Sequence, residues 1–363
     1  MATLSDRGDV IADTWYAEAL GLPSLDAAAV GWVRWLANRG PVGRGLALWW
    51  LGRRKRVVVT TLAGASNRVL LLMTRLSRRP TPQLVLLEFI PVIGAEARAA
   101  WRGGADSRTR ALASDAFWRL VARPVLKRRL LAAQTPTEWE AERFARLFEL
   151  PAQRFRHVPW LSTTVQGPMP SQDGRSGVLA SGRAACDWEG VFAAADGQPW
   201  PLTVVCSRSD EPTVRRLNRD QRATVLCEIP REQHDSLMRS AAVYLLALRD
   251  ASVSTGQVRL AEAAAAGTAV VASDVPGLAG YLEPGRTALV YRPGDSPGAQ
   301  AAIARLYAEP ELRSSIALAA WERSQAWTRD RYLEAIGKLG RRDRLAGGSV
   351  SGHRPCSPRR RES

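Results

Sequence analysis

Short runs of β-branched and apolar residues alternate with helical segments along most of this sequence. In the second half, this pattern predicts strands at 178–181, 202–206, 224–228, 243–248, 268–273 and 287–291. Helices are predicted at 187–195, 231–240, 257–266, 297–307, 310–324 and 329–339. Nearly continuous apolar strands separated by helices are typical of a parallel sheet that helices cover on both faces. The sequence therefore predicts an α/β fold built on doubly wound parallel sheets.

The first half shows the same alternation less regularly. Its pattern predicts strands at 57–61, 83–90 and 130–134, a helix at 67–76, and a basic helical segment at 108–133. Thr135 or Thr137 is expected to cap a further helix that runs to Phe148, because threonine hydroxyls accept hydrogen bonds from first-turn amides. A second, less regular α/β domain is therefore expected here.

The length of 363 residues suggests two domains. A stretch rich in Pro, Gly, Ser and Gln at 162–176 is the predicted linker between residues 1–161 and 177–326. A helix at 327–340 is expected to follow the second domain. The basic stretch 341–363 has the composition of a disordered tail.

The formal net charge is +16, and most of the positive charge comes from arginine. This excess favours anionic partners such as phosphates, an anionic membrane surface or nucleic acid. A GC-rich coding bias would also enrich arginine, alanine and glycine. Nucleic acid is not expected as a partner, because the sequence carries no nucleic-acid recognition motif.

The cysteines and histidines give no sign of a disulfide framework or a metal site. Cys186, Cys206, Cys227 and Cys356 form no CxxC pair, and only three histidines accompany them. No metal is therefore expected, and a reducing, cytoplasmic compartment fits this cysteine usage. The acidic residues among the first twenty argue against a signal peptide, and no apolar run of about 18 residues predicts a membrane span.

Tryptophan and arginine are concentrated in residues 32–56. Trp32, Trp35, Trp49 and Trp50 lie close to seven Arg or Lys side chains in this segment. One interpretation is an interfacial helix on an anionic membrane. The other, which we favour from the sequence, is an amphipathic helix that packs its tryptophans into the first domain and leaves its basic residues solvated.

The loop before the predicted helix at 257–266 is a candidate ligand site. Ligands of an open parallel sheet bind beyond the carboxyl ends of its strands, and this loop follows the strand at 243–248. Gly256 would let a phosphate approach the amides of the helix N-terminus. Alternatively, Ser254 and Gln257 form an S-x-x-Q capping box that needs no ligand.

Glu262 is an isolated acid within the alanine-rich helix that follows. A buried carboxylate is costly unless it is paired or hydrogen-bonded. One solution is to accept hydrogen bonds from the two vicinal hydroxyls of a ribose. The alternative is a glutamate on an exposed helix face, which spacing alone does not reject.

The segment from Val243 to Asp295 resembles the donor-binding half of retaining GT-B glycosyltransferases of family 4, also called group 1. Residues 262–273, EAAAAGTAVVAS, are similar to that family's EAMAxGxPVVAS, and LVYRPGD at 289–295 resembles its LLVxPGD segment. Gly277 and Gly285 match glycines of the same region. Weaker similarity at 178–183, 156–159 and 327–331 extends the resemblance over about residues 155–335.

This resemblance implies a GT-B fold, in which two Rossmann-like domains face a cleft and a C-terminal helix returns to the first domain. It also implies a nucleoside-diphosphate sugar as donor, no cofactor, and transfer with retention and without metal. Glu262 would bind the ribose, and Arg183 would neutralise the phosphates and act in catalysis, with Gly182 allowing close approach. Ser254, Thr255, Gly256 and Gln257 would face the diphosphate and the sugar.

The sequence departs from the family pattern at several positions. Ser254 stands where the family often has the first of two glutamates, and Trp188 stands where it commonly has a lysine. The first domain lacks a glycine-rich acceptor loop, so either the chain begins late or this region has diverged. It also lacks an early histidine, and the predicted strand at 83–90 instead carries Glu88, a candidate for orienting the acceptor. An exposed strand-end glutamate is the more common case.

Three functions therefore stay open. The favoured one is a glycosyltransferase of polysaccharide biosynthesis whose acceptor is a glycan, a lipid-linked sugar or a small molecule, peripheral on the cytoplasmic membrane face. The others are a catalytically degenerate binding protein and another GT-B enzyme, such as a sugar-nucleotide epimerase.

Overall fold

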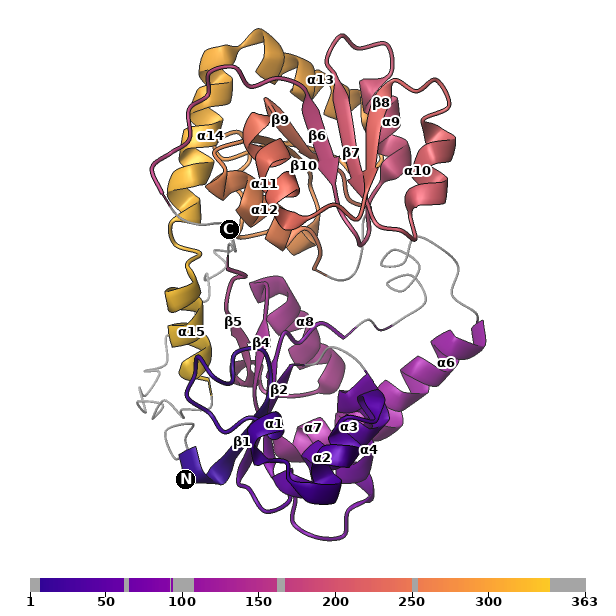
Figure 1. Cartoon of the computed structure of the whole chain (residues 1–363), viewed down its shortest axis with the longest axis vertical. Helices are drawn as coiled ribbons and strands as arrows, with labels where there is room; N and C mark the ends of the chain where they lie inside the picture. The colour runs from indigo at the N-terminus through magenta and orange to yellow at the C-terminus, as the bar shows by residue number, and fades with distance from the viewer. Residues whose placement is uncertain are drawn as a thin grey trace, which may run out of the picture.

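The computed structural model describes residues 7–61, 65–91, 93, 108–161, 167–249 and 254–339. It contains two α/β domains stacked along the long axis of the molecule, with the first domain at the bottom of Figure 1 and the second at the top. Each domain is built on one parallel sheet. The predicted basic tail at 341–363 and Cys356 lie outside the described residues.

The first sheet has five strands whose spatial order follows the chain, β1-β2-β3-β4-β5. The strands are β1 (Val10–Asp13), β2 (Val57–Thr61), β3 (Gln83–Leu87), β4 (Leu130–Thr135) and β5 (Phe155–His157). The helices are α1 (Leu25–Ala28), α2 (Gly31–Ala37), α3 (Gly40–Gly52), α4 (Ala65–Leu76), α6 (Arg108–Phe117), α7 (Arg123–Arg129) and α8 (Glu138–Phe148). A π-helical turn at Trp118–Ala122 joins α6 to α7.

This strand order places the helices that follow the strands on one face of the sheet. Right-handed crossovers that always advance in the same direction must all pass over the same face. One core accordingly packs Ile11, Val58 and Leu84 against these helices. The other face, with Val10 and Val57, therefore needs a cover from elsewhere in the chain.

That cover comes from the C-terminal helix α15 (Arg329–Gly337), together with the segment after β1. Tyr332, Ile336 and Leu339 are buried in the core that contains Val10 and Val57. Figure 1 shows α15 on one side of the first sheet and α3, α4 and α7 on the other. The first sheet is thus covered on both faces, but by helices from the two ends of the chain.

The second sheet has six parallel strands in the order β11-β10-β9-β6-β7-β8. Its strands are β6 (Val178–Ser181), β7 (Leu202–Cys206), β8 (Ala223–Cys227), β9 (Val243–Leu246), β10 (Ala269–Ser273) and β11 (Leu289–Tyr291). Its helices are α9 (Trp188–Ala195), α10 (Glu211–Leu217), α11 (Arg231–Ser240), α12 (Gln257–Ala265), α13 (Ser296–Ala308) and α14 (Pro310–Ser324). The order reverses between β6 and β9, so this sheet is doubly wound.

Sequence patterns located most of these elements. The strands β2, β6 and β7 and the helices α11 and α14 have the predicted bounds. Thr137 caps α8, because its hydroxyl accepts a hydrogen bond from the Glu140 amide at 3.1 Å. β1 and α10 were not predicted; with four and seven residues, both are too short for a clear periodicity.

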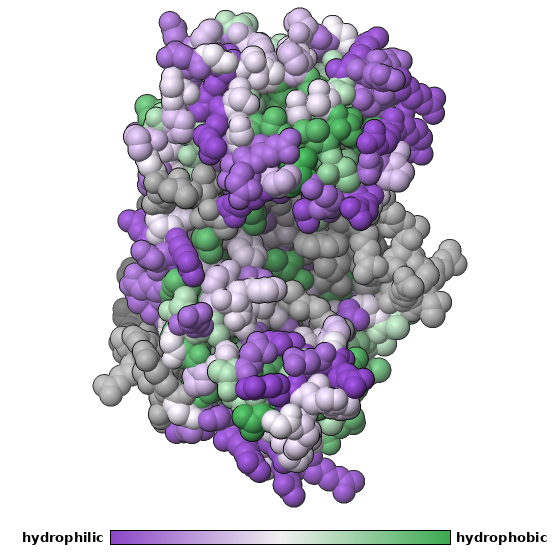
Figure 2. Space-filling view, in the orientation of Figure 1, coloured by the Kyte–Doolittle hydropathy of each residue, from purple (hydrophilic) through white to green (hydrophobic). Residues whose placement is uncertain are grey.

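The favoured interpretation of the tryptophan-rich segment is wrong for two of its four residues. Trp49 and Trp50 of α3 are half-buried against the first core, but Trp32 and Trp35 of α2 are exposed. α2 contributes Val33 and Ala37 to that core instead. On the face shown in Figure 2, hydrophilic surface predominates, with smaller hydrophobic patches in both domains. None of the described helices is both long and apolar enough to cross a bilayer.

Candidate functional site

A pocket of about 310 Å³ opens at the carboxyl ends of β6, β7 and β8 in the second domain. It lies beside the reversal of strand order, the position at which open α/β sheets bind ligands. Its lining residues come from strand ends and from two helices, α11 and α12. They are Gly182, Arg183, Val205, Cys206, Glu228, Ile229, Arg231, His234, Arg259 and Glu262.

Glu262 is buried on α12, with 7 % of its surface exposed, and lines this pocket. The Arg259 guanidinium lies one helical turn earlier and binds the carboxylate, with Nη1 2.6 Å from Oε2. An ion pair of this kind offsets part of the cost of burying the acid. The exposed-face alternative for Glu262 is therefore wrong. The i, i+3 spacing of Arg259 and Glu262 was a signal that the sequence reading missed.

His234, on α11, continues this network. Arg259 Nη1 lies 3.3 Å from His234 Nδ1, and His234 Nε2 lies 2.9 Å from Ser181 Oγ. A guanidinium can only donate, so Nδ1 accepts and Nε2 carries the proton that it donates to Ser181. Burial and the Arg259 charge lower the His234 pKa, which favours the same neutral ring. Arg259 thus connects α12 to α11 and to the end of β6.

Arg183 and Glu228 face each other across the pocket mouth. Arg183 follows β6, and its mostly exposed guanidinium contacts Glu228, with Nη2 2.8 Å from Oε2. The second Glu228 oxygen accepts a hydrogen bond from the Arg208 amide at 3.2 Å. Gly182 must be glycine for a structural reason, because a Cβ at this position would clash with the Cys186 sulfur. Packing alone is therefore enough to explain a glycine at position 182, whether or not a ligand approaches it.

The predicted site residues Ser254, Thr255, Gly256 and Gln257 lie at the start of α12 and do not line the pocket. The proposed capping box is wrong: the N-cap is Gly256, whose φ of 85° is left-handed, and no side chain caps the helix. The Gln257 amide group instead donates to the Gly277 carbonyl at 2.7 Å. Ser254 and Thr255 are buried.

Ser254 lies at a contact between the two domains. Its amide donates to Glu140 Oε1 at 2.9 Å, and its hydroxyl lies 3.3 Å from Thr137 Oγ1. Glu140 is fully buried at the start of α8, and burial raises the pKa of this carboxyl. Nearby, the Tyr281 hydroxyl donates to the Pro136 carbonyl at 2.7 Å. These pairs could not be predicted from the sequence, because their members are 114 and 145 residues apart in the chain.

Trp188, which stands where the family commonly has a lysine, does not line the pocket in this structure. Trp188 is the first residue of α9 and is buried in the core of the second domain. Positive charge at the pocket comes instead from Arg231 and Arg259, in addition to Arg183. Neither of these two arginines was identified from the sequence.

Glu88 lies apart from this pocket, directly after β3 in the first domain. Its backbone is left-handed, with φ 50°, and its amide donates to Gln134 Oε1 at 2.6 Å. The carboxylate accepts a hydrogen bond from the Tyr16 hydroxyl at 3.3 Å, and burial raises its pKa. Glu88 is thus a half-buried, held acid and not a freely exposed strand-end residue.

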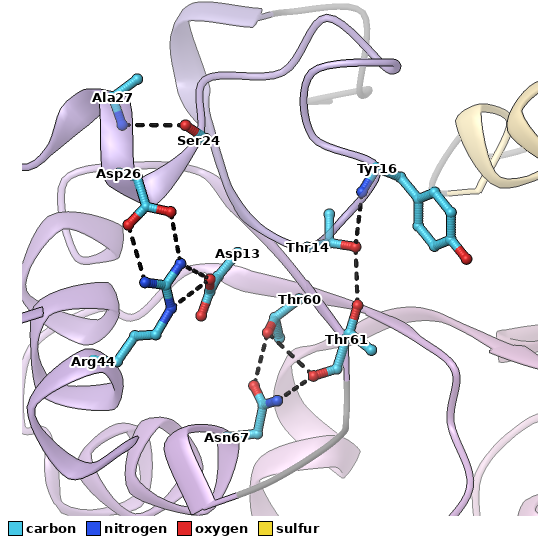
Figure 3. A network of polar contacts seen from close by, with 10 residues as sticks. All are labelled: Asp13, Thr14, Tyr16, Ser24, Asp26, Ala27, Arg44, Thr60, Thr61 and Asn67. Carbon is cyan, nitrogen blue, oxygen red and sulfur yellow. Dashed lines mark hydrogen bonds and ion pairs between the residues drawn. The ribbon is translucent and has the colours of Figure 1, made fainter. Parts of the chain in front are cut away.

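Polar side chains also fix the neighbouring ends of β1 and β2 (Figure 3). Arg44 of α3 binds Asp13 at 2.7 Å and both Asp26 oxygens at 2.9 Å. Thr14 and Thr61 share a hydrogen bond of 2.9 Å, while Thr60 and Asn67 share one of 2.8 Å. Two carboxylates thus balance the Arg44 charge. We interpret this network as stabilising the first domain and not as binding a ligand.

The described residues contain no group of three or more His, Cys, Asp or Glu side chains placed to hold a metal ion. Cys186, Cys206 and Cys227, the cysteines that the structure describes, are free thiols.

A family model described as glycosyl transferase-like matches residues 191–336. The match covers less than half of the chain, and this segment is similar to that family. All lining residues of the pocket except Gly182 and Arg183 lie within this segment. No curated protein matches the chain in sequence.

Several solved structures share the fold over most of this chain. Sucrose-phosphate synthase from Thermosynechococcus elongatus superposes with a TM-score of 0.62 at 17% identity, covering 86% of this chain and 80% of its own. HepE from Anabaena, in complex with UDP-glucose, gives 0.62 at 16% identity, covering 91% and 98%. A glycosyltransferase from Rickettsia africae gives 0.60 at 9% identity, covering 92% and 90%. The protein therefore has the GT-B fold.

Proposed function

We propose that this protein is a glycosyltransferase whose donor is a nucleoside-diphosphate sugar. The observation that carries the proposal is the pocket at the ends of β6, β7 and β8, where a buried carboxylate lies among three arginines. A carboxylate suits the vicinal hydroxyls of a ribose, and guanidinium groups suit a diphosphate. The structure of HepE with UDP-glucose supports this donor class.

In this proposal Glu262 accepts hydrogen bonds from the ribose, and Arg259 holds its carboxylate in place. Arg183, with Arg231, binds the diphosphate in place of the lysine that Trp188 replaces. The Arg183 side chain is 65 % exposed, so it is free to exchange Glu228 for a phosphate without a large desolvation cost. The amides at the start of α12, from Thr255 to Gln257, would contribute their partial positive charge.

For the transfer step we propose retention without a metal. Arg183 would stabilise the charge that develops on the leaving diphosphate, and such stabilisation is usually the largest catalytic contribution. Ser254 would remain close to the sugar through the start of α12. The acceptor, a glycan, a lipid-linked sugar or a small molecule, would enter from the first domain. Glu88, held by Tyr16, is the candidate for orienting its hydroxyl.

A thermal-shift screen of UDP-, GDP- and ADP-sugars tests the donor proposal, because a ligand that binds only the folded state raises the Tm. We expect at least one donor to raise it. Glu262→Gln should weaken that donor by about 10- to 100-fold, the typical value of a hydrogen bond to a charged group. Glu309→Gln is the matched control, since Glu309 also pairs with an arginine on a helix but is exposed. Absence of any shift, or equal effects of both variants, would contradict the proposal.

Two observations keep a binding-only function as the second candidate. Ser254 is engaged with the first domain, and Trp188 is a core residue, so two polar groups common in the family are missing from the pocket. Product analysis separates the candidates. Donor binding without transfer or donor hydrolysis would support the binding protein, and a changed sugar on the nucleotide would support an epimerase.

A further inference from the structure

The first domain carries an outer helix with two exposed tryptophans. α2 packs on α3, burying Val33 and Ala37, while Trp32 and Trp35 remain 56% and 58% exposed. Their spacing of three residues places both rings on the same side of the helix. Tryptophan is highly buried on average, so two exposed rings on one helix face indicate a surface that is covered by something else.

Arginines and apolar side chains continue this surface onto α3. The Trp32 ring packs edge-on against Trp50 at 5.1 Å, and the Arg53 guanidinium lies 3.3 Å from the Trp50 ring centre. Arg39 lies 4.4 Å from the centre of the Trp35 ring. We call this the tryptophan–arginine surface and define it by Trp32, Trp35, Arg39, Val42, Trp50 and Arg53.

The sequence around this surface carries charge of one sign. Residues 27–87 contain eleven Lys or Arg residues and no Asp or Glu. Of these, Arg44 is neutralised by Asp13 and Asp26, but Arg39 and Arg53 stack on the tryptophan rings. Desolvation and the charges of Arg54 and Arg79 lower the Arg53 pKa. The partner of this surface must therefore be anionic as well as apolar.

We propose that the tryptophan–arginine surface binds an anionic lipid bilayer. Tryptophan rings favour the headgroup boundary, arginines bind lipid phosphates, and a helix that lies flat on a domain presents both at the same depth. A bilayer is favoured over nucleic acid because Val30, two residues before Trp32, and Val42 of α3 are also exposed, and apolar side chains gain little from a nucleic acid. This inference does not depend on the proposed transferase activity.

The surface is also placed so that binding leaves the pocket open. α2 lies in the lower half of the first domain in Figure 1, away from the second domain. The pocket is formed by residues of the second domain alone. A donor would therefore reach its site while the first domain rests on a membrane.

Vesicle sedimentation with the full chain tests this proposal. The probes are vesicles of phosphatidylcholine alone and vesicles with about one third phosphatidylglycerol, which carry a negative surface potential. We expect the protein to sediment with the anionic vesicles only. The double variant Trp32→Ser/Trp35→Ser should lower the partition constant for anionic vesicles by about tenfold or more, because it removes both rings from the interface. Both residues are exposed, so the variant is expected to fold.

The matched control is Trp15→Ser, because Trp15 is 81% exposed but lies outside the tryptophan–arginine surface. It should bind vesicles as the unchanged protein does, and the donor-induced thermal shift should be equal in all three proteins. Equal vesicle binding by the double variant and the control would overturn the proposal, because charge elsewhere would then carry the binding. The proposal would also be overturned if the unchanged protein did not bind vesicles but bound a single-stranded oligonucleotide, and the double variant lost that binding.

Discussion

At the scale of single residues, Arg259 and Glu140 show how this chain manages buried charge. Arg259 contacts the Glu262 carboxylate and the His234 ring, so one cation orients two polar groups of the pocket. The Glu140 carboxylate accepts hydrogen bonds from the Ser254 amide and the Thr137 hydroxyl. Burial raises the Glu140 pKa, with the hydrogen bonds and the more distant charge of Arg143 acting in the opposite direction.

Glu140→Gln should therefore stabilise the protein at neutral pH. A folded-state pKa above the unfolded value means that the native protein holds its proton longer, so stability falls as the pH rises through the folded pKa. Glutamine does not titrate and still accepts a hydrogen bond from the Ser254 amide. The Tm difference between variant and unchanged protein should be small near the ordinary pKa of glutamate and should grow toward pH 7.

Thermal unfolding across this pH range measures the difference. Glu142→Gln, on the same helix but exposed, is the control and should give a difference that depends little on pH. A Glu140→Gln variant that is less stable than the unchanged protein at pH 7 would show that the ionised carboxylate is required at the domain contact.

Residue-level predictions succeeded where the sequence itself contained an anomaly. Glu262 was identified because an acid within an alanine-rich helix needs a partner, and the structure places it in a pocket. Its partner Arg259 is three residues away and could have been found from helical spacing. The contacts of His234 with Arg259 and of Glu140 with Ser254 could not, because the fold joins residues that are 25 and 114 positions apart.

At the scale of secondary-structure elements, caps and strand ends position the polar groups of both domains. Most strands followed from β-branched runs such as Val57–Thr61. The start of α12 did not follow from its cap signal. Gly256 adopts a left-handed φ, and a Cβ there would lie 2.7 Å from the Leu248 side chain, so packing decides this cap. Local chemistry thus predicted the cap of α8 correctly and the cap of α12 incorrectly, although both helices were expected.

Thr137→Ala tests the cap of α8. Loss of the hydroxyl leaves the Glu140 amide without its acceptor and should lower the free energy of unfolding by about 1 kcal/mol or more. The hydroxyl also lies beside Ser254, so we expect a loss toward the upper end of the usual range for an N-cap, about 2 kcal/mol. Urea unfolding measures the change, and Thr137→Ser, which keeps the hydroxyl, should recover most of it. An unchanged midpoint for Thr137→Ala would show that the cap contributes nothing measurable.

At the scale of the whole molecule, the two domains are joined by more than their linker. One apolar face of the first sheet is covered by α15, which lies near the other end of the chain. Trp160 stacks on Tyr332 of this helix, with ring centres 6.3 Å apart and planes at 7°. The sequence resemblance implied the return of this helix. The strand order that makes the helix necessary could not be predicted, because it depends on long-range pairing and not on local pattern.

Ile336→Ala should destabilise the first domain, although the substitution lies beyond the second domain in the chain. Ile336 is buried against the first sheet, and truncating such a side chain typically costs about 2–5 kcal/mol. Hydrogen exchange should show the largest loss of protection in β1 and β2. Glu334→Ala, an exposed change on the same helix, is the control. Equal loss of protection in β9 and β10 would indicate that the two domains unfold as one unit.

The dependence of the first sheet on α15 has a consequence during synthesis on the ribosome. When residues 10–157 have emerged, all five strands of that sheet are present, yet the segment from 329 onward has still to be translated. The nascent chain must therefore carry a hydrophobic face that is only partly covered, by the segment after β1, for the time needed to make the entire second half. We therefore expect chaperones to bind this face of the nascent chain and to dissociate once α15 has been made and has packed on the sheet.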